Sequence, residues 1–173
     1  MYVAFLRGIN VGGKTVKMDI LKKSFEEIGF ANVRTLLASG NVLFESETSD
    51  EPVLVRQIES KLREVFGFEI IVQIRTKEYL HELILANPFK EGGSVDVKLY
   101  VSFLTPNTKN VLIIPYESPD KTFSIISATK YELFSTLYTG GKSTDAMNII
   151  DKKFGKKVTT RNWNTIKKIA MLQ

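Results

Sequence analysis

The chain has 173 residues, of which 43% are hydrophobic and 25% charged, and it carries a net charge of +5. This composition is typical of a globular protein with one domain or two small ones. The absence of cysteine excludes disulfides and thiolate metal sites and fits a reducing compartment. No apolar run approaches the about 18 residues of a membrane span, and the N-terminus has no secretory pattern. We therefore expect a cytoplasmic protein that has no membrane partner.

In chain order, the first half is predicted to contain a strand over 2–7, a helix over 18–28, strands over 33–38 and 42–45, a helix over 52–66 and a strand over 69–75. The first helix is indicated by the helical spacing of Met18, Leu21 and Phe25, and Gly29 can cap its end. The order β-α-β-β-α-β is that of a split βαβ, ferredoxin-like unit.

The second half is predicted to contain a helix over 77–86, a strand over 97–104, a short helix over 106–114, strands over 122–127 and 131–138, a helix over 144–154, and a last helix capped by Thr159 or Thr160. The predicted fold class is α+β, with two ferredoxin-like halves over 1–78 and 79–173. The second half lacks its last strand and ends in two basic helices.

Residues 7–15 read RGINVGGKT, and Gly8 to Thr15 match the P-loop pattern G-x-x-x-x-G-K-[ST]. A P-loop needs a helix that starts at the Lys-Thr pair, whereas the helical periodicity starts only at Met18. A P-loop also belongs to a parallel sheet, whereas this sheet is predicted to contain a hairpin. Phosphoryl transfer further needs an acidic residue that binds magnesium, and no acidic residue is evident at the end of a buried strand. We therefore do not predict a nucleotide-hydrolysis site.

A ligand site is predicted instead where two loops meet. In the split βαβ order, the loop after the first strand and the turn after the second emerge at the same end of the sheet. The side chains and free glycine N–H groups there suit an anionic or strongly polar ligand. The candidate residues are Arg7, Gly8, Asn10, Gly12, Gly13, Lys14, Ser39, Gly40 and Asn41. The alternative is structural: glycines that form tight turns and asparagines that bond their own backbone.

The C-terminal segment from Lys142 to Gln173 has eight basic and two acidic residues, a net charge of +6, which leaves −1 for the rest. Within it, Arg161 and Trp163 of TTRNWNT can join the ligand site or form a nucleic-acid patch with the lysines. The more common interpretation is a solvated lysine face and a tryptophan docked in the core. His81 is predicted to be a surface residue, and no metal or cofactor is predicted.

Three motifs resemble one uncharacterised family. They are FLRGINVGGK at 5–14, SGNVLFES at 39–46 and TTRNWNT at 159–165. Together they resemble the bacterial family known as domain of unknown function 1697, over nearly the whole chain. The resemblance implies an α+β, ferredoxin-like duplication whose glycine loop is not a P-loop, and Thr15 is not part of the family motif. It implies no activity, cofactor or catalytic residue.

Three functions follow as hypotheses, and whether the protein is an enzyme is left open. The first is the binding of a polar or anionic ligand that carries phosphate or carboxylate, at the two loops. The second is nucleic-acid binding through the basic C-terminal segment. The third is a protein interaction module in which the motifs are purely structural. The oligomeric state cannot be read from the pattern.

Overall fold

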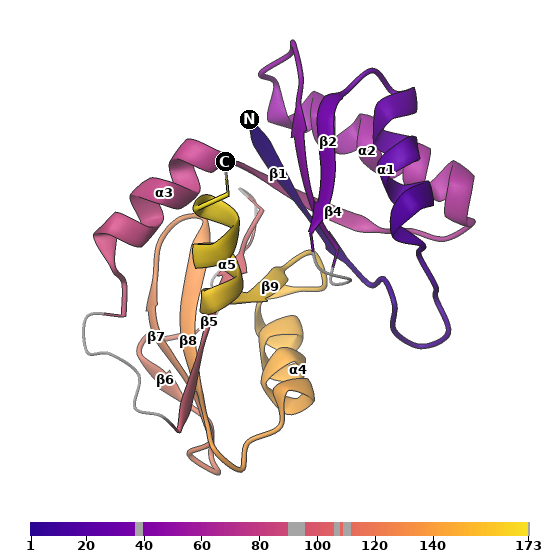
Figure 1. Cartoon of the computed structure of the whole chain (residues 1–173). Helices are drawn as coiled ribbons and strands as arrows, with labels where there is room; N and C mark the ends of the chain where they lie inside the picture. The colour runs from indigo at the N-terminus through magenta and orange to yellow at the C-terminus, as the bar shows by residue number, and fades with distance from the viewer. Residues whose placement is uncertain (37–39, 90–95, 106–107, 109–111, 173) are drawn as a thin grey trace. The chain divides into compact units, whose positions relative to one another are not determined.

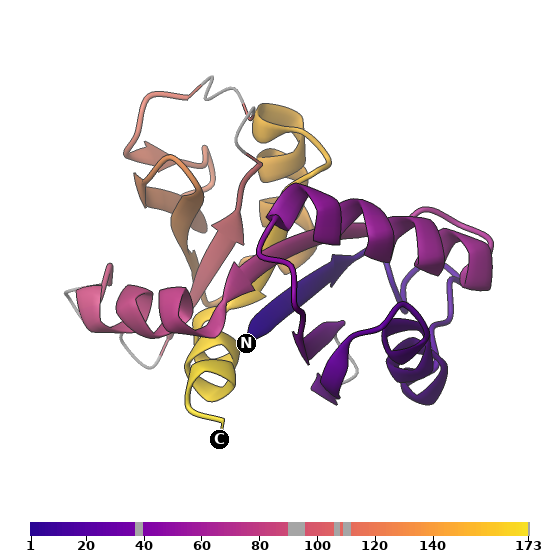
Figure 2. The same ribbon diagram turned by 90° about the horizontal axis from the view of Figure 1, so that it is seen from above.

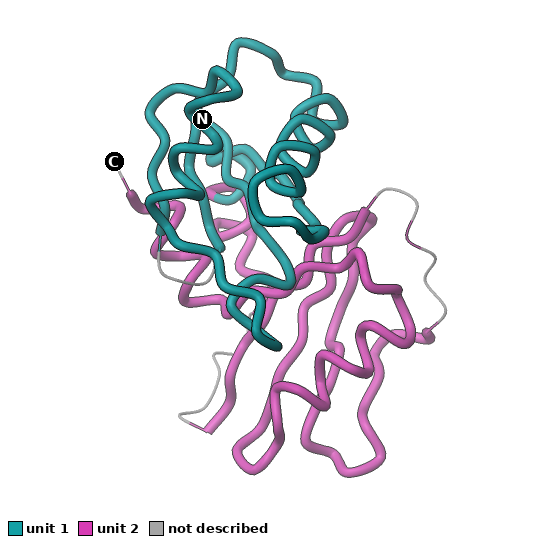
Figure 3. The backbone as a smooth tube through the Cα atoms, turned by 90° about the vertical axis from the view of Figure 1, so that its right-hand side faces the viewer, with its two compact units in different colours: residues 1–80 teal, residues 81–173 magenta. Residues whose placement is uncertain are grey.

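The computed structural model describes residues 1–36, 40–89, 96–105, 108 and 112–172 of the chain. Within them the fold is α+β, with five helices and two antiparallel sheets, and this confirms the predicted class. The chain divides into two compact units, Met1–Leu80 and His81–Gln173, each built around its own sheet (Figure 3). The boundary lies inside helix α3 (Lys77–Ala86), which directly follows β4 (Ile71–Thr76) (Figure 2).

The first unit carries four strands and two helices ahead of α3. In chain order they are β1 (Tyr2–Arg7), α1 (Met18–Glu27), β2 (Ala31–Leu36), β3 (Asn41–Glu45), α2 (Glu51–Phe66) and β4 (Ile71–Thr76). The strands lie in the order β2-β3-β1-β4, all pairs are antiparallel, and the β2–β3 register shifts between Ala31 and Arg34. Because β1 and β2 both run antiparallel to β3, their carboxyl ends emerge at the same end of the sheet.

The two helices α1 and α2 cover one face of this sheet (Figure 1). Helix α1 buries Leu21 and Phe25, at the spacing that predicts an amphipathic helix, and the Phe25 ring contacts Phe44 of β3. Helix α2 begins after Asp50, whose carboxylate accepts a hydrogen bond from the main-chain N–H three residues later. It ends at Gly67, which has a φ of 76° and so adopts the left-handed conformation that glycine tolerates best.

The second unit carries five strands in the order β6-β7-β8-β5-β9, again all antiparallel. After α3, its elements are β5 (Val97–Phe103), β6 (Tyr116–Glu117), β7 (Phe123–Ala128), β8 (Glu132–Tyr138), α4 (Ser143–Phe154), β9 (Thr159–Asn162) and α5 (Trp163–Ala170). The helix predicted over 106–114 falls mostly outside the described residues, and 112–114 are not helical. Without the short β6, the order β7-β8-β5-β9 repeats the order β2-β3-β1-β4 of the first unit.

One prediction about the second unit was wrong, because this unit does not lack its last strand. Thr159–Asn162 forms β9, which pairs with β5 and sets Thr159 opposite Phe103. The sequence TTRN has no apolar alternation, and threonine is common both in strands and at helix N-caps, so the pattern favoured a cap. Asn162 caps α5 instead, by accepting a hydrogen bond from the main-chain N–H of Asn164 at 2.9 Å.

Helices α4 and α5 lie on opposite faces of the second sheet. Helix α4 buries Ile150 in a cluster that includes Leu133 of β8. Trp163 of α5 instead contacts Phe89, whose ring contacts Phe134 of β8. Neighbouring residues of a strand point to opposite faces of a sheet. Because α4 packs on the side of Leu133 and α5 on the side of Phe134, the two helices lie on different faces. The basic C-terminal segment is therefore divided between two faces of the sheet.

Candidate functional site

The loop after β1 and the turn before β3 meet at one end of the first sheet, as the strand order requires. The main-chain N–H of Leu6 donates a hydrogen bond to the carbonyl of Gly40 at 2.7 Å. A Cβ atom at Gly40 would lie only 2.7 Å from the Cδ1 of Ile9, and the φ of Gly40 is 74°. The positive φ therefore favours glycine, and the Cβ of Leu6, which would lie 3.1 Å from an added Cβ, leaves little room for a larger residue. Ser39, the predicted neighbour, lies outside the described residues.

The two predicted asparagines hold these loops in shape. The Oδ1 of Asn10 accepts a hydrogen bond from the main-chain N–H of Val16 at 2.9 Å, just before α1 begins. Asn41 is fully buried, and its Nδ2 donates to the carbonyl of Leu36 at 3.3 Å, which joins the two ends of the turn before β3. Both side chains thus perform the structural task that was the alternative to ligand binding.

The tip of the glycine loop is exposed and carries a positive charge. The main-chain N–H of Lys14 donates to the carbonyl of Val11 at 3.1 Å, across Gly12 and Gly13. These glycines have φ values of 57° and 81°, which a tight type I′ turn requires. The ammonium of Lys14 lies 5.1 Å from the ring centroid of Phe68, a cation–π contact that restricts where the lysine points.

Arg7 lies on the other face of the first sheet from Lys14. Leu6 belongs to the core cluster under α1 and α2, so the next residue, Arg7, points to the opposite face. Phe68, which Lys14 contacts, packs against that same helix-covered cluster. The two loops therefore meet at one end of the sheet, but their two cationic side chains are divided between its faces.

Helix α1 begins at Met18, beyond the Lys-Thr pair of the loop, and the sheet beside it is antiparallel. Both observations exclude a P-loop, as predicted. Its N-cap residue is Lys17, whose own side chain makes no capping hydrogen bond. The first main-chain N–H groups of α1 thus keep the partial positive charge of an uncapped helix start. Gly8 opens the loop with a φ of 79°.

The C-terminal candidates Arg161 and Trp163 are held within the second unit. Trp163 is 4% exposed, and its ring centroid lies 5.2 Å from that of Phe89. Arg161 is half-buried in β9, where its guanidinium donates to the carbonyl of Thr160 at 2.9 Å and burial lowers its pKa to about 10. Trp163 is thus a core residue, and its face is not open to a stacking base. That both residues join the glycine-loop site stays a prediction.

A family model described as a protein of unknown function, DUF1697, matches residues 1–134. The chain belongs to this family. The solved structure of a conserved bacterial protein, SP0830 from Streptococcus pneumoniae, is similar with a TM-score of 0.74 and 21% identity, covering 98% of this chain and 95% of that one. At that identity the likeness shows the fold alone. No curated protein matches the chain in sequence. Both loops of the first unit fall inside the DUF1697 match, whereas Arg161 and Trp163 lie beyond it.

The sequence of this DUF1697 chain contains a short repeat that our sequence analysis did not use. The pattern Gly-Gly-Lys-[ST] occurs at 12–15 and again at 140–143. The second copy begins α4, with Lys142 as the N-cap. A Cβ atom at Gly141 would lie 2.7 Å from the Cδ1 of Leu137 and 3.0 Å from the Cβ of Thr122, so this glycine allows the segment before α4 to lie close to the end of β8. A Cβ atom added at Gly12 or Gly13 of the first copy would have nothing within 4 Å. Both glycines of the first copy are therefore unobstructed, whereas in the second copy only Gly140 is.

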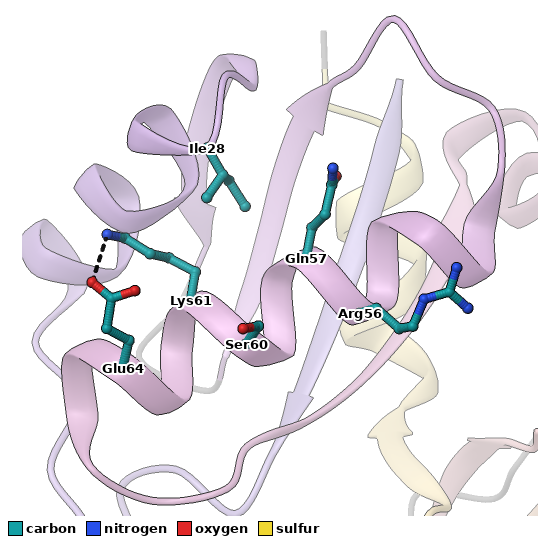
Figure 4. A pocket seen from close by; sticks show the side chains of 6 residues that line it. All are labelled: Ile28, Arg56, Gln57, Ser60, Lys61 and Glu64. Carbon is teal, nitrogen blue, oxygen red and sulfur yellow. Dashed lines mark hydrogen bonds and ion pairs between the residues drawn. The ribbon is translucent and has the colours of Figure 1, made fainter.

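A shallow groove of about 500 Å³ lies along α2 (Figure 4). It is lined by Ile28, Arg56, Gln57, Ser60, Lys61 and Glu64. The ammonium of Lys61 lies 2.9 Å from Glu27 and 3.4 Å from Glu64; the hydrogen bond with Glu27 raises the pKa of Lys61 and lowers that of Glu27. The charge of Lys61 is thus already neutralised, and Arg56 lies at the other end of the groove from Glu64. No predicted site residue lines this groove.

Within the described ranges, no group of three His, Cys, Asp or Glu side chains is placed to hold a metal ion. In the same part of the chain, no helix combines the length and the apolar character needed to cross a membrane. His81 is exposed on α3, as the sequence predicts.

Proposed function

We propose that the first unit binds a small anionic ligand, one that carries phosphate or carboxylate, at the tip of the glycine loop. One observation carries this proposal: an exposed lysine, two glycines with open space around them and an uncapped helix start all occur within residues 12–18. In this proposal Gly12, Gly13 and Lys14 contact the ligand. Asn10, Gly40 and Asn41 hold the loop in the conformation that presents them.

The physical basis is the sum of three modest attractions. Lys14 and Lys17 are both exposed and contribute two positive charges beside the start of α1. Main-chain N–H groups of a glycine turn and of an uncapped helix add partial positive charge and hydrogen-bond donors. The cation–π contact with Phe68 restricts Lys14 in advance, which lowers the entropy lost on binding. Asp19, exposed in the first turn of α1, opposes these attractions.

We also infer that both units are ferredoxin-like, split βαβ units. The support is their shared strand order, β2-β3-β1-β4 and β7-β8-β5-β9, with a helix before the last strand in each. This topology is why the glycine loop meets the turn at Gly40. It carries no function by itself, since such folds host many activities.

Thermal unfolding in the presence of inorganic phosphate, nucleotides and small carboxylates tests the proposal. We expect at least one of these anions to raise the melting temperature of the wild-type protein. Lys14→Gln should weaken binding about tenfold or more, because a charge-assisted contact is lost. Asp19→Asn should tighten binding, because a repelling carboxylate is removed from the helix start.

The matched control is Arg56→Gln, which removes one exposed positive charge from α2, in the groove and away from the loop. We expect it to leave anion binding within about twofold of wild type, because no loop contact is lost. Equal losses in the Lys14 and Arg56 variants would assign the effect to net charge and overturn the site. No stabilisation of the wild-type protein by any of these anions would overturn the function.

A further inference from the structure

We propose that the second unit binds the phosphate backbone of a nucleic acid through a lysine surface at the end of α4. This surface consists of Lys152 and Lys153 in the last turn of α4, and Lys156 just after the helix. Lys152 and Lys156 are exposed, and Lys153 is half-buried. The inference is independent of the glycine loop, which belongs to the other unit.

Ion pairing distinguishes this surface from the helices of the first unit. On α1, Lys22 and Lys23 lie 3.6 and 3.8 Å from glutamates one turn further along the helix. On α2, Lys61 lies between two glutamates. By contrast, none of the three lysines of the lysine surface forms an ion pair with any residue that the structure describes. Their charges are therefore available to a partner.

Helix stability explains only part of this arrangement. Cations in the last turn of a helix interact favourably with its partial negative end, and Lys152 and Lys153 benefit in this way. Lys156 follows the cap residue Gly155 and lies outside that turn, yet it adds a third like charge within five residues. Like charges so close together repel each other, and a polyanion relieves the repulsion.

The partner is inferred to contact the surface through phosphates rather than bases. Trp163, the aromatic residue that could have stacked on bases, is 4% exposed and belongs to α5 on the other face of the second sheet. Lysines are point charges that attract phosphates without reading a sequence. We therefore expect weak, sequence-independent and strongly salt-dependent binding, with about 0.9 counterions released per phosphate contact on duplex DNA.

Fluorescence anisotropy with a labelled DNA duplex of about 20 base pairs, with salt raised from about 50 to 200 mM, tests this proposal. The full-length double variant Lys152→Gln/Lys156→Gln should bind at least tenfold more weakly than wild type at low salt. The slope of log K against log salt should fall in magnitude by about 1.8, because two contacts are lost. A duplex of unrelated sequence should bind the wild-type protein equally.

The matched control is Lys167→Gln/Lys168→Gln, which removes the same charge from α5 on the opposite face. This variant should keep its affinity within about threefold of wild type, and its salt slope should be unchanged. Because Lys152 also supports the end of α4, the single variant Lys156→Gln, outside the helix, should show about half of the slope change while unfolding at the wild-type temperature. Equal weakening in both double variants, absence of binding at low salt, or binding to polyglutamate but not to DNA would each overturn the proposal.

Discussion

Asn10 accepts a hydrogen bond from the main-chain N–H of Val16 at 2.9 Å, and this contact closes the glycine loop. Asn10 has a φ of 54°, so Asn10→Gly relieves the backbone while removing the acceptor. We expect this variant to lose about 1–2 kcal/mol of unfolding free energy, because the donor of the buried Val16 is left without its partner. Asn10→Asp keeps an acceptor and should lose much less. Urea denaturation measures both values, and an equal loss in the two variants would contradict the role of the acceptor.

Gly40 is required both for its conformation and for the space around it, and these two effects can be separated. Gly67 has a φ of 76°, close to the 74° of Gly40, but a Cβ atom there meets nothing within 4 Å. We expect Gly67→Ala to cost about 1 kcal/mol of stability, and Gly40→Ala about 2 kcal/mol or more, because the added methyl group displaces the end of the Ile9 side chain and crowds the Cβ of Leu6 at 3.1 Å. Chemical denaturation of both variants checks the difference. Equal costs would mean that the loop moves aside readily.

Trp163 is the sole tryptophan and is almost fully buried against Phe89. Its fluorescence should therefore have a short-wavelength maximum and resist quenching by iodide, and added DNA should leave its emission unchanged. Trp163→Ala should cost about 3–5 kcal/mol of stability and Trp163→Phe clearly less, because most of the packing is kept. Efficient quenching by iodide in the folded protein would show that the ring is accessible, contrary to this prediction.

Asp120 accepts hydrogen bonds from the hydroxyls of Ser118 at 2.6 Å and Thr122 at 2.9 Å. These bonds hold the pKa of the Asp120 carboxyl below its ordinary value of 3.8. Because the folded state binds this proton less readily than the unfolded state, the contact stabilises the protein above pH 3.8. The stabilisation is lost as the pH falls through the lower folded value.

Asp120→Asn should therefore be less stable than wild type at neutral pH, and the difference should shrink as the pH falls below 3.8. Denaturation curves at a series of pH values measure this difference. A gap that stays constant over the whole range would show that the charge of Asp120 contributes nothing.

Over the described residues, the predicted elements of the first unit agree with the structure to within two residues at each end, because local signals mark both their interiors and their ends. Residues 37–38 of the strand predicted over 33–38 lie outside the described residues. Helix α2, for example, has apolar residues at helical spacing and the left-handed Gly67 at its end. Strand β9 was missed because its partner, β5, lies far away in the sequence. A four-residue polar segment such as TTRN becomes a strand only through that pairing, which no local pattern reveals.

The proximity of the two loops was predictable from the sequence, but the orientation of their side chains was not. The strand order places the glycine loop beside the turn at Gly40, and Leu6 and Ile9 do lie against Gly40; that a ligand binds there stays a prediction. The loop sequence does not tell which side chains serve the loop itself, and Asn10 proved to be one of these. The loop sequence also does not show that the side chains of Arg7 and Lys14 lie on different faces of the sheet. This depends on which face Leu6 occupies and on the position of Phe68.

The register shift between Ala31 and Arg34 has a consequence for association between molecules. Strand β2 lies at the edge of the first sheet, where a regular strand would present unpaired N–H and C=O groups to another chain. The shift, together with Asn32 at a φ of 51°, interrupts that row of groups. Such a bulge disfavours continuation of the ladder by a second copy of the chain past this point, and so disfavours strand addition and fibril-like stacking at β2.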